Sequence, residues 1–397
     1  MMASIQDDGA MSQPFPVTNG VKQGCVLAPT LFSMIFSAML IDAFTSSDDG
    51  ISIQYRMDGS VFNQRRLQAV TKVKETIIRD LLFADDCALN ASSEQMMQAS
   101  MDKLSSACDN FGLTISTKKT EVMFQPAPGK PYQEPAILVK GQKLQAVDNF
   151  TYLGSTLSRQ VTIDVEVNKR IARASSAFGR LRSQVWERRG ISVHTKLKVY
   201  QAVILPTLLY ACESWTVYSR HAKRLNHFHT TCLRKLLRIR WQDKVPDTEV
   251  LSRAGLSSIH TLLEKSQARW AGHVVRMSDD RIPKQLLFGQ LSEGKRAPGR
   301  PKKRFKDCLK DSLTSLDIPT DTWESLAQDK CKWRSTVNAG VKLAENKRTA
   351  HAEQKREKRK ARSSASTPID GTHVCTTCGR KFLARIGLIS HQRTHNR

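Results

Sequence analysis

Two adjacent carboxylates, Asp85 and Asp86, interrupt an apolar run that extends from Ile77 to Asn90. The run is long enough for two short strands, and Ala84-Asp85-Asp86 falls at its middle, where a hairpin would turn. Carboxylates are hard oxygen ligands for Mg²⁺, and a pair at a strand end can anchor two metal ions that clamp the oxygens of a phosphoryl transfer. An isolated Asp-Asp pair is more often a solvated turn, so the neighbouring sequence must decide.

The second candidate site is a set of four metal-ligating residues near the C-terminus: Cys375, Cys378, His391 and His395. Their spacing, Cys-x2-Cys-x12-His-x3-His, is that of a Cys2His2 zinc site, and Phe382 and Leu388 occupy the two apolar positions of that module. Such a small unit cannot bury enough apolar surface to fold unaided, so Zn²⁺ binding must supply the folding free energy. We expect a ββα zinc finger over residues 368–397.

The finger positions that would reach base edges are Ala384, Gly387 and Ser390. These residues lack the bidentate hydrogen-bond donors that discriminate between bases. We therefore expect either a weakly specific contact with nucleic acid or a contact with protein.

Four short motifs resemble those of a known family. Phe83-Ala84-Asp85-Asp86 resembles the Phe/Tyr-x-Asp-Asp box of reverse transcriptases, and Gly20 to Phe32 resembles the Gly-x-x-Gln-Gly block of the same palm domain. Phe111 to Ile115 with Lys119-Thr120 is similar to the next block, and Tyr152-Leu153-Gly154 to the primer-grip turn. In order and spacing, the chain is similar to the rear of the palm, the thumb and the C-terminal region of a non-LTR (LINE-type) retrotransposon reverse transcriptase.

The resemblance implies roles for individual residues. The catalytic residues would be Asp85, Asp86 and Lys119, and the nucleotide- and template-binding residues would be Gln23, Gly24 and Phe83. Asp85 and Asp86 would hold magnesium. Lys119 would lie near the leaving pyrophosphate as a general acid, although a solvated surface lysine is an equal alternative.

The family's two-metal chemistry needs a third carboxylate, from a block that precedes Gly20 in the palm, and the sequence lacks that block along with the fingers. Asp85 and Asp86 alone cannot hold both metals in the geometry of an in-line displacement. We therefore expect an RNA-directed DNA polymerase fragment without autonomous activity. The alternative is a non-catalytic zinc-finger protein that binds nucleic acid through basic helices.

The charge distribution also points to a nucleic-acid partner. The chain has 397 residues and a formal net charge of +25. Residues 1–160 contain 14 Lys/Arg and 16 Asp/Glu, a net charge of −2, so the remainder carries +27. A globular fold does not need this excess, whereas a phosphate backbone uses it, because each neutralised phosphate releases condensed counterions. We expect RNA and DNA partners, in particular a primer-template duplex.

A basic segment, Gly294 to Arg304, contains Gly299-Arg300-Pro301 and is similar to an AT-hook, which places Arg in the minor groove of A·T-rich DNA. A flexible basic loop and a nuclear-import signal are alternatives. We expect a nuclear protein with a possible cytoplasmic pool. The nine cysteines lack a disulfide-like rhythm, which indicates a reducing compartment, and no apolar stretch predicts a membrane segment.

We expect an α+β fold in five parts. These are a disordered N-terminus (1–19), a partial palm with an antiparallel sheet and helices (20–160), a helical thumb and C-terminal region (161–345), a basic helix and linker (346–367), and the finger (368–397). In the palm, Ile51 to Tyr55 is a predicted strand. Leu31, Met34, Ile35, Ala38 and Ile41 keep helical spacing and predict a buried helix face.

In the predicted thumb, basic residues such as Arg170 and Arg173 surround the apolar stripes of several helices and would form a duplex-binding surface. Further on, Arg269 to Arg276 resembles the Arg-Trp-x-Gly-His-Val-x-Arg block of LINE-type C-terminal regions. Within this block, His273 has no second metal ligand at ligand spacing, which favours a structural histidine with its hydrogen bonds satisfied.

Overall fold

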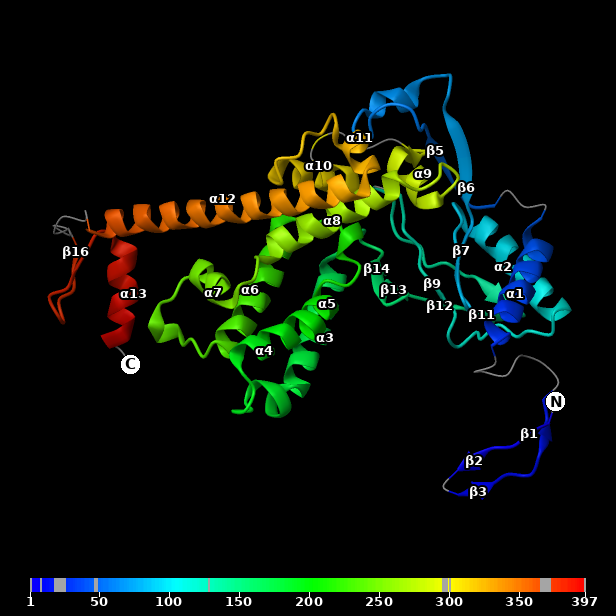
Figure 1. Cartoon of the computed structure of the whole chain (residues 1–397), viewed down its shortest axis with the longest axis horizontal. Coiled ribbons are helices and arrows are strands. Elements are labelled where there is room, and N and C mark those ends of the chain that lie inside the picture. Colours follow the sequence, from blue (N-terminus) through cyan, green and yellow to red (C-terminus); the bar gives the residue numbers. More distant parts are fainter. Residues whose placement is uncertain are drawn as a thin grey trace.

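The computed structural model describes residues 2–7, 9–17, 26–45, 49–127, 129–294, 299, 301–364 and 373–395. These residues form the predicted α+β fold (Figure 1): small sheets and two helices come first, then a helical region, then a ββα unit at the end of a long helix. No helix among these residues is both long and apolar enough to cross a membrane.

The N-terminus contains strands where the sequence analysis predicted disorder. Strand β1 (Met2–Ala3) pairs with β4 (Phe15–Pro16), and between them β2 (Gln6–Asp7) pairs with β3 (Ala10–Met11), each pair antiparallel. Gly9, with φ of +84°, lies in the β2–β3 turn, a conformation that glycine adopts without a steric penalty. The Asp8-Gly9 dipeptide in the sequence is itself a hairpin signal.

Two helices pack against each other in the palm: α1 (Ala28–Phe44), with Pro29 in its first turn, and α2 (Glu94–Asn110), capped by Ser93. Their shared core contains Met39, Ala43, Phe44, Leu104, Ala107 and Cys108. The predicted buried face of α1 was wrong, because Leu31, Met34, Ile35 and Ile41 are exposed. The helix α1 carries apolar side chains on most of its faces, so their spacing along the sequence could not show which face packs against α2.

The remaining palm strands form short two-stranded sheets. They are β7 (Asp80–Phe83) with β8 (Asp86–Leu89), β9 (Glu121–Val122) with β12 (Gln145–Ala146), β10 (Leu138–Val139) with β11 (Gln142–Lys143), and β13 (Asn149–Tyr152) with β14 (Ser155–Ser158). Only the β9–β12 pair is parallel among these four.

A three-stranded sheet joins the two halves of the chain. The predicted strand β5 (Ile51–Tyr55) pairs with β6 (Lys74–Ile78) on one side and with β15 (Gly289–Leu291) on the other. In the connection between β5 and β6, which includes the short helix η1 (Gln64–Gln68), Val61 is fully buried in the C-terminal core and its N–H donates to Glu324 Oε1 at 2.8 Å. The predicted domain boundary at residue 160 is therefore crossed by segments that pack on the helical region.

The helical region contains fourteen helices among the described residues, in addition to the strand β15, and the first twelve run from α3 to α10. They are α3 (Asp164–Arg180), η2 (Arg182–Trp186), α4 (Val193–Val199), η3 (Tyr200–Ile204), α5 (Leu205–Leu208), η4 (Cys212–Ser214), α6 (Ser219–Leu236), η5 (Trp241–Asp243), α7 (Asp247–Ala254), α8 (Ile259–Val275), α9 (Ile282–Phe288) and α10 (Phe305–Ser315). Two further helices, α11 (Trp323–Gln328) and α12 (Lys330–Ser364), follow. One core lies among α3 to α8 and includes Tyr200, and a second lies among α8 to α12 and includes Trp323.

Helix α12 is continuous over 35 residues and reaches from the helical region to the finger (Figure 1). The predicted boundary at residues 345 and 346 falls inside it. Its first half packs on α8 through Trp333, Val337 and Val341, whereas residues 351–361 are exposed on all sides. The exposed half is nearly all Ala, Glu, Lys and Arg, which are strong helix formers, so nothing ends the helix at the predicted position.

Candidate functional site

The predicted hairpin forms at the two carboxylates. Strands β7 and β8 pair in the register Phe83 to Asp86, so Ala84 and Asp85 make a two-residue turn, with Ala84 at φ of +53°. Asp85 and Asp86 are exposed, and among the described residues neither carboxylate has a hydrogen bond or an ion pair. Both are therefore free to take a ligand. Their catalytic role remains a prediction.

The rest of this hairpin is only partly covered. Phe83 is 62% exposed, and Leu81 and Leu82 are also exposed. Next to the acids, Cys87 is half-buried, and burial, followed by the charge of Asp80, raises the pKa of its thiol to about 12. Cys87 is thus a neutral thiol at physiological pH and no candidate nucleophile.

The motif similar to a primer grip lies beside the carboxylates. Tyr152 ends β13, and Leu153 and Gly154 form the turn to β14, with φ of +47° and +78° respectively. The Tyr152 hydroxyl donates to the carbonyl oxygen of Leu81 at 2.9 Å. Burial raises the pKa of Tyr152, and the charge of Asp86 raises it further. Two motifs that are about 70 residues apart in sequence are thus joined in the fold.

Side chains of the helical region, from α3 and from Tyr210, bind the backbone of this turn. Arg170 and Arg173 both donate to the carbonyl oxygen of Gly154, and the Tyr210 hydroxyl donates to that of Leu153 at 2.9 Å. Glu166 accepts the N–H of Thr156 at 2.8 Å. The turn between β13 and β14 is therefore tied both to the hairpin of Asp85 and to the helical region.

Glu166 and Arg170 form an ion pair at 2.5 Å, with exposed fractions of only 3% and 4%. The sequence predicted Arg170 as part of a duplex-binding surface, and this was wrong, because its side chain is buried. A buried carboxylate pairs with the arginine, and the turn carbonyl accepts a further bond, so the charge is compensated inside the fold. Glutamate four residues before arginine was the only sequence signal for this pair.

The other predicted palm residues are not brought to the carboxylates by the described structure. Gln23 and Gly24 lie outside the described residues. Lys119 is exposed in the turn from Ser116 to Thr120, and no hydrogen bond or ion pair links its side chain to Asp85 or Asp86 in the described part of the chain. The role of Lys119 as a general acid remains a prediction.

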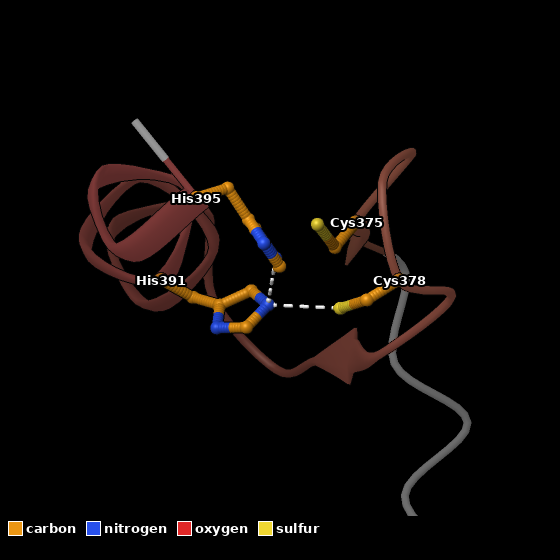
Figure 2. Close-up of side chains that lie close together, drawn as sticks. All are labelled: Cys375, Cys378, His391 and His395. Carbon is orange, nitrogen blue, oxygen red and sulfur yellow. Dashed lines mark hydrogen bonds between the residues drawn. The ribbon is translucent and has the colours of Figure 1, made fainter. Parts of the chain in front are cut away.

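The C-terminal unit has the predicted ββα form: β16 (His373–Val374) pairs with β17 (Lys381–Phe382), and α13 (Arg385–His395) follows. Four ligand atoms, one each from Cys375, Cys378, His391 and His395, lie within 4.8 Å of one another. Figure 2 shows the two thiols and the two imidazoles facing one space, with His391 Nε2 at 3.0 Å from both Cys378 Sγ and His395 Nε2. This donor set is compatible with one tetrahedral zinc ion, bonded at about 2.0–2.3 Å.

Basic side chains continue along the exposed half of α12 toward this unit. Lys355, Arg356, Lys358, Arg359 and Lys360 are all exposed. Most of the segment similar to an AT-hook, residues 295–298 and Arg300, lies outside the described residues. Of the two basic segments predicted before the finger, the structure therefore describes fully only the one on α12, and its cations are exposed.

Comparisons with known proteins agree with the motifs. Residues 2–157 match the family described as reverse transcriptase (RNA-dependent DNA polymerase). The chain is 26% identical over 270 residues to an uncharacterized transposon-derived protein of Caenorhabditis elegans, covering 66% of this chain and 95% of that protein.

Two further relatives are described as the RNA-directed DNA polymerase from mobile element jockey. The Drosophila melanogaster protein is 22% identical over 253 residues, and the Drosophila funebris protein is 25% identical over 255 residues. Each match covers 62% of this chain and 25% of the relative, so the matched segment spans about a quarter of each jockey polymerase.

Proposed function

Because residues 2–157 form a reverse transcriptase domain related to those of non-LTR retrotransposons, we propose that the chain binds a primer-template duplex of RNA and DNA. The observation that carries this proposal is the bond from Tyr152 to Leu81, which sets the turn similar to a primer grip against the hairpin of Asp85 and Asp86. The positive charge of the helical region and α12 supplies the sites for backbone phosphates.

In this proposal Asp85 and Asp86 bind magnesium. Magnesium would supply the Lewis acid that stabilises charge on the reacting phosphate. The two carboxylates are exposed and lack protein partners among the described residues, so binding a cation breaks no existing ion pair. Among those residues, however, the only group of three or more ligand side chains suited to a metal is the Cys/His cluster. We therefore propose that the described residues bind duplex without completing a two-metal site.

Primer extension tests the catalytic half of this proposal. The full chain, with Mg²⁺, an RNA template and a DNA primer, should extend the primer no more than its Asp85→Ala variant does. Robust synthesis that Asp85→Ala abolishes would contradict the proposal and show an autonomous polymerase.

Binding is measured separately by fluorescence anisotropy with a labelled RNA–DNA hybrid. The logarithm of the association constant should fall linearly with that of the salt concentration, by roughly 0.9 for each phosphate contacted. An affinity that does not change with salt would contradict phosphate binding.

We propose that zinc occupies the cluster of Cys375, Cys378, His391 and His395. Metal analysis of the full chain should find one zinc ion per molecule, and Cys378→Ser should remove it. Exposed Cys331, which lies outside the cluster, provides the control: Cys331→Ser should leave the zinc content unchanged. Equal zinc in the Cys378→Ser variant would contradict this site.

A second candidate function, a non-catalytic nucleic-acid-binding protein, is favoured by the exposed basic half of α12, a helix that is continuous to Ser364. A variant lacking residues 368–397 decides the finger's part: a weakened affinity for the hybrid supports a finger contact, and an unchanged affinity excludes one. We propose a nuclear location for either function, and a fluorescent fusion that stays in the cytoplasm would contradict it.

A further inference from the structure

A cavity of about 390 Å³ lies where α8 meets the start of α12. No residue of the β7–β8 hairpin or of the finger lines it. Its wall contains four cationic side chains, two indoles and an imidazole: Arg269, Arg276, Lys330, Arg334, Trp270, Trp333 and His273. The four cations set the cavity apart from the neighbouring apolar core, which contains Trp333 and against which Trp270 packs.

The Arg-Trp-x-Gly-His-Val-x-Arg block builds this wall from one face of α8. Arg269, His273 and Arg276 recur at intervals of four and three residues, so they lie along one side of the helix. His273 is exposed and lies at the cavity, with its ring centroid 5.5 Å from that of Trp270. The prediction of a structural histidine with its hydrogen bonds satisfied was therefore wrong.

The glycine of the same block explains how α12 reaches the cavity. A Cβ on Gly272 would lie 2.1 Å from Nε1 of Trp333, so the indole packs directly on the backbone of α8. Trp333 Nε1 also donates to the carbonyl oxygen of Ala268 at 3.1 Å. This packing positions the first turns of α12, which bring Lys330 and Arg334 to the cavity opposite α8.

The cations of the cavity are largely uncompensated within the protein. Arg276 donates to the carbonyl oxygen of Ala327 at 2.5 Å. Arg269, Lys330 and Arg334 are exposed, and the described structure shows no hydrogen bond or ion pair from their side chains. Glu213 is the single carboxylate in the lining. Like charges held together attract an anionic ligand, and guanidinium groups match phosphate geometry.

We propose that this cavity binds a nucleotide of single-stranded nucleic acid, with the base stacked on Trp270 and the flanking phosphates on Arg269, Lys330 and Arg334. The inference rests on the proposed function, because it assumes a nucleic-acid partner. The volume is that of a site for one small ligand, and a base can stack on an indole only when it is unpaired. A duplex presents its backbone to such a cavity and keeps its bases inside.

Fluorescence anisotropy of the full chain tests the proposal with two probes, a labelled 12-nucleotide oligouridine and a labelled 20-base-pair RNA–DNA hybrid. Trp270→Ala should raise the Kd for oligouridine about tenfold, because the stacking of one base is removed, and change the Kd for the hybrid less than about twofold. Trp270→Phe should keep most of the affinity. Trp241, which is 82% exposed and outside the cavity, is the matched control, and Trp241→Ala should bind both probes as the native chain does.

A double variant, Arg269→Gln with Arg334→Gln, tests the phosphate-binding side chains without touching a buried residue. It should lower the salt slope for oligouridine by roughly 0.7 for each phosphate that is no longer neutralised, and it should leave the thermal unfolding temperature unchanged. Unchanged oligouridine binding in both this variant and Trp270→Ala would overturn the proposal. An equal weakening for the hybrid, or displacement of oligouridine by an acidic peptide in a Trp270-dependent manner, would overturn it too.

These outcomes separate the present inference from the proposed function. Binding of oligouridine that depends on Trp270, without binding of the hybrid, supports the cavity and contradicts the duplex function. Binding of the hybrid, together with binding of oligouridine that does not depend on Trp270, supports the duplex function and contradicts the cavity site. A chain that binds neither probe contradicts both.

Discussion

The reverse transcriptase region, residues 26–160, and the helical region, residues 161–361, bury their apolar side chains to very different extents. In the helical region Tyr200, Leu225, Leu309 and Trp323 are each 0% exposed and belong to two large cores. In the reverse transcriptase region, by contrast, the exposed apolar side chains include Val26 at 91%, Met34 at 64%, Ile41 at 65% and Phe83 at 62%.

This contrast shows that the largest cores of the described chain lie in the helical region. The helical region supplies nearly all of the side chains of the two large cores, with Val61 added from the first region, and its residues Arg170, Arg173 and Tyr210 hold the turn of Leu153 and Gly154. The reverse transcriptase region carries its carboxylates and several apolar side chains on open surfaces, and exposed apolar patches often mark sites of interaction. The following predictions test this contrast, from the largest expected effect to the smallest.

Truncating the core of the helical region should have the largest effect. Trp323→Ala removes a fully buried indole and should lower the free energy of unfolding by about 3–5 kcal/mol. All six tryptophans lie after residue 160, so fluorescence during urea unfolding reports on this region. Trp241→Ala, at an 82% exposed site, should cost less than about 0.5 kcal/mol. Similar losses for the two variants would show that the core is not packed as described.

The contact between α8 and α12 should tolerate no added methyl group. Gly272→Ala places a Cβ 2.1 Å from Trp333 Nε1, and the resulting overpacking should cost about 3 kcal/mol in the same urea measurement. Gly179→Ala in α3 is the control, because its Cβ would meet nothing within 4 Å and alanine favours the helix. We expect Gly179→Ala to be neutral or stabilising, and a neutral Gly272→Ala would contradict the close packing.

The helical region should lose stability in mild acid. His229 is fully buried, its Nδ1 lies 2.8 Å from the Tyr200 hydroxyl, and burial lowers its pKa to about 4. In the unfolded chain the histidine pKa is about 6.5, so between these values the unfolded state binds more protons and stability falls as pH falls. From pH 7 to pH 5 the loss should be about 2 kcal/mol.

Urea unfolding at the two pH values measures this loss. His229→Gln should remove about 2 kcal/mol of the dependence. Burial also lowers the pKa of His260, which should leave a remainder of the same sign. His227→Gln, at an exposed position of the same helix, should retain the full dependence. Identical pH dependence in the two variants would show that another group is responsible.

The smallest effect is expected on the open face of α1. Met34→Ala, at a 64% exposed position, should change local stability by no more than about 0.5 kcal/mol. Met39→Ala, five residues further along the same helix and 1% exposed, should cost about 2–5 kcal/mol. Hydrogen exchange of peptides from α1 measures both. A large loss of protection in Met34→Ala would mean that this face is covered in solution, and the contrast between the regions would fail.

Features specified by short-range chemistry were predictable from the sequence. The β7–β8 hairpin at Asp85 and the ββα unit around Cys375 both formed as predicted, because turn geometry and ligand spacing are local properties. Long-range pairing was not predictable in the same way. Nothing in residues 51–55 indicates that Gly289–Leu291 completes their sheet. Nothing in the spacing of apolar residues along α1 indicates that the side of Met39 is the one that packs against α2.

By itself, the sequence determined the order of the motifs, the four-residue donor set near the C-terminus and the excess of positive charge after residue 160. These depend only on residue types and on spacing along the chain. The tertiary structure decided which charges are buried and which are free: Arg170 is enclosed with Glu166, while Arg269 and Arg334 stand open around Trp270. Burial depends on segments that are distant in sequence, so residue spacing alone could not distinguish these arginines.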